Sequence, residues 1–395
     1  MAVRLGATDS VTTIDLGLVP FYWRTKPAPG PDGSGIPQRL PFAFAFDTGL
    51  QLVIQQRRPE VLNWLNVVYT RDTNVGYLQE GHSLAESYGN DFLHFFARTA
   101  RPSSYGRGQS LAEIGCGGVY LLDRLRAQGY DVVGIDPSPV TVRAGARAGI
   151  RIIPEFFPSP SLHESFDVII HYDVLEHTDD PVAFLGAHRN HLRPGGEVVL
   201  AVPDCTAHIA GGDIAMMLHE HLNYFDEASL GLTVRTAGFE PIAIERSSHG
   251  GVLFCRARLG GTSSPPPAGS TAKFDGFAKL VGGTRASISV IFESAHRRGE
   301  DIGCYVPLRA FPYLGPALDA DIRVRLFDDD PGVHGRYFDG IDLPVENMHD
   351  LIARPPRNLI VFSQAFGDAI CDRVAAATDG RTAIATIGRL TGGGD

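Results

Sequence analysis

Residues 110–118 read SLAEIGCGG, a short apolar strand that runs directly into a glycine-rich turn. Helical periodicity follows at residues 120–128, so the turn joins a strand to a helix. Glycine permits a tight turn and lets a ligand approach the backbone closely, and the start of a helix favours a carboxylate or phosphate group. The stretch therefore predicts a ligand-binding turn in a strand–helix–strand unit.

Asp136 favours a nucleotide as the ligand of this turn. It ends the second predicted strand, residues 131–135, where a carboxylate can accept both hydroxyls of a ribose. A glycine turn alone also occurs in ordinary strand-to-helix connections, so the inference depends on its combination with Asp136. The spacing differs from the G-x-G-x-x-G pattern of a nicotinamide site.

Strands and helices continue to alternate beyond this unit. Strands are predicted at residues 110–114, 131–135, 151–153, 166–172 and 197–202, and helices at 120–128, 140–148 and 181–192. Two more strands, 239–246 and 252–259, are joined by a loop that contains SHGG and predict an antiparallel end to the sheet. We expect an α/β fold in which helices cover both faces of a mainly parallel sheet.

Two irregular segments divide the chain into three parts. Residues 260–273 contain GGTSSPPPAGSTA and predict a linker, and RPSSYGRGQ at 101–109 predicts a weaker break. The expected units are a small N-terminal domain, a central domain, a linker and a smaller C-terminal α/β domain, at residues 1–100, 101–259, 260–273 and 274–395. Strands predicted at 302–305, 323–327 and 359–363 support the α/β character of the last one.

Composition narrows the classes of partner. The 395 residues carry a net charge of −10 and no run of five basic residues, which argues against nucleic-acid binding. No stretch of about 18 apolar residues predicts a membrane span, and the N-terminus lacks the apolar core of a signal peptide. The five cysteines are dispersed without a Cys-x-x-Cys pair, which predicts reduced thiols, a cytoplasmic location and no bound metal. The oligomeric state has no signal in the sequence.

The central domain resembles the class I S-adenosylmethionine-dependent methyltransferases, which have a Rossmann-like fold. The resemblance is carried, in order, by EIGCGG, GIDPS, FDVIIHYDVLEH and LRPGGEVVLAVP. It implies S-adenosylmethionine as cofactor, with Gly115 and Gly117 at its methionine part, Asp136 at the ribose, and the segment from Glu155 to Phe157 at the adenine. The full set implied to bind it is Glu113, Gly115, Gly117, Asp136, Pro137, Glu155, Phe156, Phe157 and Tyr172. The third glycine of the family's loop is Val119 here, a departure that puts the shape of the loop in question.

A second resemblance concerns the reaction. HEHLNYF at 219–225 places two histidines and a carboxylate within three residues, a pattern that suits acid–base chemistry but also a polar loop that caps a helix. Together with SHGG, LPFAFAFDTGLQLV and the C-terminal DDDPGVHGRYFDGIDLPV, it is similar to the sugar C-methyltransferases, which act on nucleotide-linked keto-deoxysugars. The acceptor implied is a small molecule of that class.

The same resemblance implies roles for individual side chains. His221 is expected to be the base, Glu220 to orient or polarise it, and His177 to be a further polar group near the reacting carbon. For His177 a solvent-exposed position at a helix start is the alternative. A tyrosine between residues 69 and 77, with Tyr77 as the candidate, is expected to close the site from the N-terminal domain.

Three departures keep other functions open. Ala45 and Thr48 stand where that family has zinc-binding cysteines, Leu218 replaces a tyrosine, and CYVP at 304–307 replaces a glycine motif. The N-terminal domain must then be held by its apolar core. The alternatives are an O- or N-methyltransferase on another natural-product intermediate, or a cofactor-binding subunit without activity.

Overall fold

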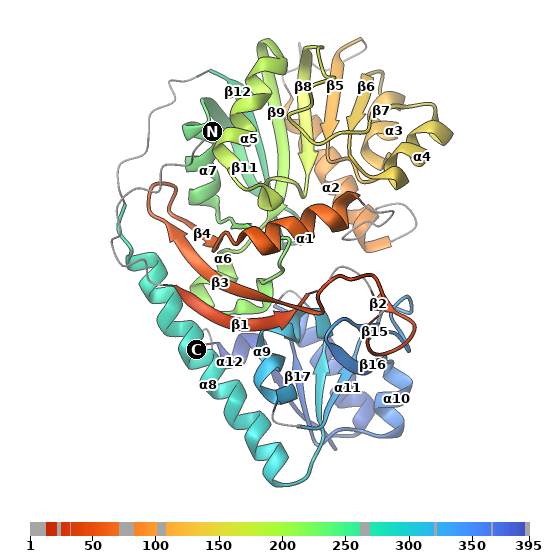
Figure 1. The fold of residues 1–395 in the computed structure, drawn as a ribbon, viewed down its shortest axis with the longest axis vertical. Coiled ribbons are helices and arrows are strands. Elements are labelled where there is room, and N and C mark those ends of the chain that lie inside the picture. The colour runs from red at the N-terminus through yellow and green to blue at the C-terminus, as the bar shows by residue number, and fades with distance from the viewer. Residues whose placement is uncertain are drawn as a thin grey trace.

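The computed structural model describes residues 13–21, 25–31, 33–70, 83–100, 108–260, 269–319, 322–364 and 366–391. Three sheets form the scaffold: a seven-stranded central sheet, a four-stranded N-terminal sheet and a seven-stranded C-terminal sheet. Figure 1 shows the N-terminal sheet lying between the other two, with the long helix α8 (Ala272–Arg297) along one side. The predicted α/β class is confirmed.

The central sheet has the order β7-β6-β5-β8-β9-β12-β11. Its strands are β5 (Ser110–Ile114), β6 (Asp131–Ile135), β7 (Arg151–Ile153), β8 (Phe166–Tyr172), β9 (Leu192–Pro203), β11 (Phe239–Arg246) and β12 (Val252–Leu259). The five strands from β7 to β9 are parallel, and β12 runs antiparallel to both of its neighbours. The order reverses between β5 and β8, and ligands of such sheets bind at the carboxyl ends of the strands beside this reversal.

Alternation along the strands divides the apolar side chains between two cores. On β8, for instance, Val168 and Ile170 belong to one core and Ile169 to the other. The first core lies under α2 (Ser83–Thr99), α3 (Tyr120–Ala127) and α4 (Pro139–Ala148), and the second under α5 (Pro181–His188) and α7 (Glu227–Thr236). Local signals bound these helices: Ser138 caps the start of α4, and Gly149 ends it in a left-handed conformation, φ 66°.

Most predicted strands have the observed bounds, but the fifth does not. The expected helix at 181–192 ends at His188 and is followed by the single turn η2 (Arg189–His191), and β9 begins at Leu192 rather than 197. The stretch is strand because Leu192 pairs with Phe166 across a register shift in the neighbouring strand, a contact that local sequence does not encode.

The N-terminal sheet is built from β1 (Ile14–Pro20), β3 (Arg39–Asp47), β4 (Leu52–Gln55) and the distant β10 (Asn223–Tyr224). Aromatic rings hold it together: Phe44 packs edge-on against Phe277 of α8, and Phe46 stacks on Phe274. Ala45, between Phe44 and Phe46 in the sequence of β3, is also buried. An apolar core thus holds this sheet, as expected from the sequence. Helix α1 (Pro59–Thr70) leads back toward the central sheet.

The C-terminal sheet has the order β18-β17-β13-β14-β16-β15-β2. Its strands are β2 (Thr25–Lys26), β13 (Ile302–Tyr305), β14 (Val324–Phe327), β15 (Tyr337–Phe338), β16 (Ile341–Glu346), β17 (Asn358–Val361) and β18 (Ala383–Thr386), and its helices are α9 (Pro307–Asp319), α10 (Met348–Ala353), α11 (Gly367–Thr378) and α12 (Ile387–Leu390). β2 adds an N-terminal strand to this sheet, and a buried Lys26–Asp339 ion pair of 2.7 Å secures it.

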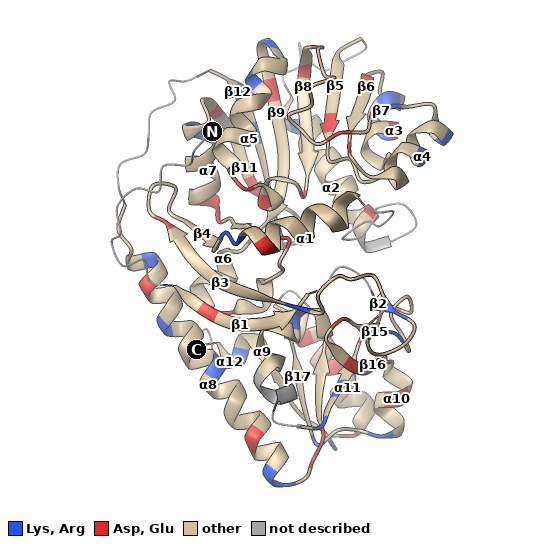
Figure 2. Ribbon diagram, viewed as in Figure 1, with Lys and Arg blue, Asp and Glu red and all other residues tan. Residues whose placement is uncertain are grey.

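Three elements thus pack outside the domains to which the sequence assigned them. β2 joins the C-terminal sheet, β10 joins the N-terminal sheet, and α2 packs on the central sheet although it precedes residue 101. Acidic and basic residues are interspersed along α8 and around the C-terminal sheet (Figure 2). Within the described ranges, no helix has both the length and the apolar character needed to cross a membrane.

Candidate functional site

The glycine turn after β5 has a geometry that requires glycine. Gly115 and Gly117 adopt φ of 66° and 54°, in the left-handed region. A Cβ on Gly115 would lie 2.5 Å from Cγ2 of Val174, which follows the neighbouring strand β8. The turn is therefore packed against the segment after β8, and no larger residue fits at position 115.

Val119 does not disturb this turn. Its φ is −130°, a conformation that every residue other than proline adopts readily, and its side chain is buried in the core below α3. The glycine that the related family has here is not needed for the backbone path of this chain. The departure noted in the sequence leaves the loop geometry intact.

Asp136 ties the glycine turn to the next βα connection. Its Oδ2 accepts from the backbone N–H of Gly117 and its Oδ1 from that of Ser138, each at 2.8 Å. Thr141 supports the same turn by donating from its hydroxyl to the Gly117 carbonyl. Burial raises the pKa of Asp136. Each carboxylate oxygen retains a lone pair for a further donor, so the residue can order the turn and still accept from a ligand.

Glu113 is a second buried carboxyl beside the turn. Its side chain is 3 % exposed, and Oε2 has no hydrogen-bond partner among the described residues. Burial, with Asp136 nearby, raises the pKa of Glu113 well above its usual range. Pro137 follows Asp136 and is half-buried. A glycine cradle, an acid at the end of β6 and a buried carboxyl group with one unpartnered oxygen fit the amino-acid and ribose parts of S-adenosylmethionine.

The side chains of the predicted adenine segment, Glu155 to Phe157, differ in their exposure to solvent. Phe156 is 47 % exposed. Phe157 is instead half-buried and packs against Phe184 and His188 at the edge of the core, with ring centroids 5.6 and 4.8 Å away. Glu155 is half-buried, and its carboxylate accepts from the hydroxyls of Ser159 and Ser161. An apolar pair such as Phe156-Phe157 gives no signal of which ring turns inward.

Tyr172, at the end of β8, packs edge-on against Phe92 of α2 at 5.4 Å. It is half-buried, and burial raises its pKa above the ordinary value. Asp173 follows it with φ 54°, unusual for a residue other than glycine. Its side chain is partly open to solvent, but the loss of hydrating water to the surrounding protein atoms raises the pKa of Asp173 to about 7.

His177 and His221 come from separate loops and meet beyond the carboxyl end of β8. His177 ends the short turn η1 (Leu175–His177), and His221 lies between η3 (Ile214–Met216) and β10. Their ring centroids are 5.0 Å apart, with the planes inclined at 75°. The hydroxyl of Tyr69, from α1, lies 3.1 Å from Nδ1 of His177. The two predicted histidines are thus neighbours.

Hydrogen bonds define the tautomer of His177. Its Nδ1 lies 2.9 Å from the backbone carbonyl oxygen of Glu220. A carbonyl only accepts, so we infer that Nδ1 carries the proton and that Nε2 is the free acceptor. Nε2 lies 3.7 Å from Oε1 of Glu176.

Burial determines the protonation of this cluster. It lowers the pKa of His177 to about 4 and that of His221 well below its usual range, so both imidazoles are neutral at pH 7. Burial and Asp173 raise the pKa of Glu220 to about 8, against the opposing effect of Arg309, and burial also raises the pKa of Glu176. The cluster combines two neutral bases with the Glu220 carboxyl group, which holds its proton at neutral pH.

Several residues of the site were not predicted from the sequence. Glu176 is 1 % exposed, and neither of its carboxyl oxygens has a hydrogen-bond partner among the described residues. From the predicted segment 69–77, the hydroxyl of Tyr69 reaches His177. The candidate Tyr77 lies outside the residues that the structure describes. His219 faces away: its Nε2 donates to the Leu40 carbonyl at 3.1 Å, between the rings of Phe21 and Phe42.

The same cluster offers ligand atoms of a kind that binds metals. One atom each of Glu176, His177 and His221 lies within 4.8 Å of the others. The sequence expectation of no metal was based on the cysteines, and the five cysteines are indeed buried free thiols far from one another in the chain. A histidine–carboxylate group assembled from two distant loops gives no spacing signal in a sequence.

Comparisons with known proteins agree with this geometry. Residues 82–244 match a family described as a methyltransferase domain. A ubiquinone biosynthesis O-methyltransferase of Cereibacter sphaeroides is 31 % identical over 153 residues, which are 34 % of this chain and 62 % of that protein. A tRNA U34 carboxymethyltransferase of Pseudoalteromonas translucida is 35 % identical over 107 residues, 24 % of this chain and 32 % of that protein. The chain thus spans less than two thirds of the length of these relatives.

Among solved structures, the 1,6-didemethyltoxoflavin-N1-methyltransferase of Burkholderia thailandensis, with bound S-adenosylhomocysteine, is 18 % identical and has a TM-score of 0.37. That match covers 59 % of this chain and 99 % of the other. The N-methyltransferase NodS of Bradyrhizobium japonicum, also with S-adenosylhomocysteine, is 17 % identical at a TM-score of 0.38, over 50 % of this chain and 98 % of the other. From the family match, the strand order and the glycine turn, we conclude that the central part of this chain, residues 82–244, is a class I S-adenosylmethionine-dependent methyltransferase domain.

Proposed function

We propose that the whole chain methylates a small-molecule acceptor, with His221 as the base, at a carbon beside the ketone of a nucleotide-linked deoxysugar. The observation that carries the proposal is the pairing of neutral His177 and His221 with protonated Glu220 beyond the end of β8. Val174, which touches the glycine turn at Gly115, is only three residues from His177. The acid–base cluster therefore adjoins the cofactor turn.

The side chains suit the two tasks of such a reaction. S-adenosylmethionine supplies, when bound, an electrophilic methyl group. Nε2 or Nδ1 of His221 accepts the proton that leaves the carbon, and the two electrons of the broken C–H bond pass toward the ketone oxygen. The protonated carboxyl of Glu220 can donate a hydrogen bond to that oxygen as its negative charge develops. His177, whose ring neighbours that of His221, and the Tyr69 hydroxyl bonded to it add further polar groups to the site.

Cofactor affinity is expected to depend on Asp136. Asp136→Ala should weaken binding of S-adenosylhomocysteine by about 1–3 kcal/mol, the range for a lost partner of buried polar groups. Isothermal titration calorimetry measures the dissociation constant of S-adenosylhomocysteine in each variant. Thr141→Val is the matched control, because it removes the hydroxyl that bonds the Gly117 carbonyl but leaves the carboxylate in place. Equal losses in both variants would assign Asp136 to ordering the turn, and an unchanged affinity in Asp136→Ala would remove it from the cofactor site.

The pH dependence of turnover is expected to be bell-shaped. Burial lowers the pKa of His221, so the rising limb should lie at lower pH than the value of about 6.5 for an unperturbed histidine. Glu220 has its pKa raised to about 8, so it keeps its proton below that pH and loses its donor function above it. In Glu220→Gln the amide still donates but does not titrate, and the falling limb near pH 8 should disappear. A falling limb that survives in this variant belongs to another group.

Hydrogen exchange tests methylation at carbon. The enzyme with S-adenosylhomocysteine and a nucleotide-linked keto-deoxysugar in deuterated water should exchange the hydrogen beside the ketone, because proton removal does not need the methyl donor. Proton NMR follows the signal. In His221→Ala the exchange rate should fall to that of the buffer. Methyl transfer without any exchange, or a methyl group found on oxygen, would contradict the proposal.

A second candidate is an O-methyltransferase, favoured by the similarity to the ubiquinone biosynthesis O-methyltransferase of Cereibacter sphaeroides. The same base would then remove a proton from a hydroxyl group, and no carbon-bound hydrogen would exchange. The exchange experiment therefore separates the two reactions. The match that favours this second candidate covers 34 % of this chain. The acid–base cluster also includes Tyr69, which lies outside residues 82–244, the region that matches the methyltransferase family. The similarity therefore does not extend to the whole cluster.

A further inference from the structure

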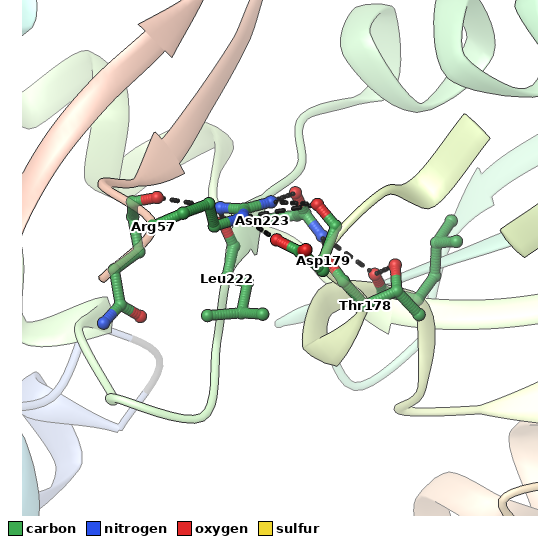
Figure 3. Close-up of polar contacts among 7 residues, drawn as sticks. Arg57, Thr178, Asp179, Leu222 and Asn223 are labelled. Atoms are coloured by element: carbon green, nitrogen blue, oxygen red, sulfur yellow. Dashed lines mark hydrogen bonds and ion pairs between the residues drawn. The ribbon is translucent and has the colours of Figure 1, made fainter. Parts of the chain in front are cut away.

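Arg57 lies just after β4 in the N-terminal sheet and reaches the two loops that carry the histidines (Figure 3). Nη1 donates to the carbonyl oxygens of Gln55 at 2.8 Å and Leu222 at 2.6 Å. Nη2 donates to the Asp179 carbonyl at 2.9 Å and to Oδ1 of Asn223 at 2.8 Å, and Nε donates to Oδ1 of Asp179 at 3.0 Å. All five N–H groups of the guanidinium are therefore used.

Asn223 extends this contact into the His177 loop. While its Oδ1 accepts from Arg57, its Nδ2 donates to the carbonyls of Leu175 at 3.1 Å and Thr178 at 2.7 Å, on either side of His177. The backbone completes the link, since Leu222 donates its N–H to the Glu176 carbonyl at 2.7 Å. The residues next to His221 are thus bonded to the residues next to His177.

We infer that Arg57 is a positioning residue that sets the spacing of His177 and His221. This inference rests on the proposed acid–base function of the two histidines. The five guanidinium hydrogen bonds of Arg57 described above all go to other groups than the two imidazole rings. Arg57 bonds the segment 222–223 directly and the segment 175–179 both directly and through Asn223. The two loops come from positions more than 40 residues apart in the sequence and no strand pairs them with each other. The bonds of Arg57 therefore add to the single Leu222–Glu176 backbone bond in holding their relative position.

Geometry, rather than charge, is the contribution of Arg57. Its acidic partner Asp179 has a side chain that is 67 % exposed, and an ion pair with such an exposed member contributes little. Four of its five acceptors are neutral: three backbone carbonyls and one amide oxygen. The planar guanidinium group can donate to all of these acceptors at once, whereas the ammonium group of lysine cannot. Lysine at position 57 should therefore fail although it keeps the charge.

The test compares Arg57→Ala and Arg57→Lys with Asp179→Asn, which removes the partner's charge but keeps an acceptor and the backbone carbonyl. Turnover should fall about 10²-fold in both arginine variants, as for a displacement of catalytic groups by about 1 Å, and stay near the parental value in Asp179→Asn. Affinity for S-adenosylhomocysteine should be unchanged, because the bonds of Arg57 lie outside the glycine turn. Added guanidinium ion should restore part of the turnover of Arg57→Ala but not of Arg57→Lys.

A second measurement does not need the acceptor. Nitrogen-15 NMR of histidine-labelled protein with S-adenosylhomocysteine reports the tautomer of His177, which should be protonated at Nδ1 in the parent and in Asp179→Asn but a mixture in Arg57→Ala. If Arg57→Ala does not fold, Arg57→Lys provides the same comparison. Parental turnover and an unchanged tautomer in the arginine variants would overturn the positioning role. Parental turnover in His221→Ala would instead contradict the proposed function, and the NMR comparison would still decide the role of Arg57.

Discussion

Replacing His221 by alanine is expected to lower turnover by a factor of about 10²–10⁴, the usual contribution of a positioned general base. The imidazole is neutral because burial lowers its pKa, so it is ready to accept a proton over the whole neutral range. Steady-state kinetics at saturating cofactor measure the effect. His221→Asn should be almost as impaired, because its amide occupies similar space but cannot take up the proton.

His219 supplies the matched control for this substitution. It stands two positions earlier, is buried, and bonds the Leu40 carbonyl in the N-terminal sheet rather than facing the cluster. His219→Gln can keep that bond and should retain turnover. Calorimetry should find cofactor affinity intact in His221→Ala. If His221→Ala keeps more than about a third of parental turnover, far above the range for a lost base, His221 is structural.

The Arg256–Glu197 pair is expected to give the largest effect on stability. Arg256 of β12 is 2 % exposed and donates to Glu197 of β9 from Nε at 2.8 Å and from Nη2 at 2.5 Å. It also donates to the Phe96 carbonyl at 2.8 Å and to the Thr99 hydroxyl at 3.2 Å, near the end of α2. Glu197→Ala leaves this buried cation without a counter-charge, so the free energy of unfolding should fall by about 3–5 kcal/mol. Urea unfolding followed by circular dichroism measures it.

Two further variants show whether burial is the cause. Arg258 and Glu240 form an exposed ion pair on neighbouring strands, so Glu240→Ala should cost less than about 1 kcal/mol. Replacing both buried partners, as Glu197→Leu with Arg256→Met, should recover much of the loss, because no uncompensated charge remains. A cost in Glu197→Ala no larger than in Glu240→Ala would mean that water reaches Arg256.

The residues around the cofactor turn were largely predictable because their signals are local. The strand at 110–114, the glycines at 115 and 117 and the acid at 136 lie within one strand–helix–strand unit, and periodicity identifies such a unit directly. The position of His221 beside His177 followed only from the family resemblance. No spacing in the sequence relates the two residues, because they meet through the order of the strands rather than through a shared element.

By itself, then, the sequence determined the alternation of strands and helices, the glycine turn and the carboxylate at the end of β6, since apolar periodicity and backbone conformation are properties of short segments. Tertiary structure alone decided that Phe157 turns inward, that Glu176 is buried, that the Tyr69 hydroxyl reaches His177, and that β2 and β10 join sheets distant in sequence. Each of these depends on which surfaces meet when separate elements pack. That choice follows from the burial of the whole chain and from pairing between remote strands, neither of which a local pattern contains.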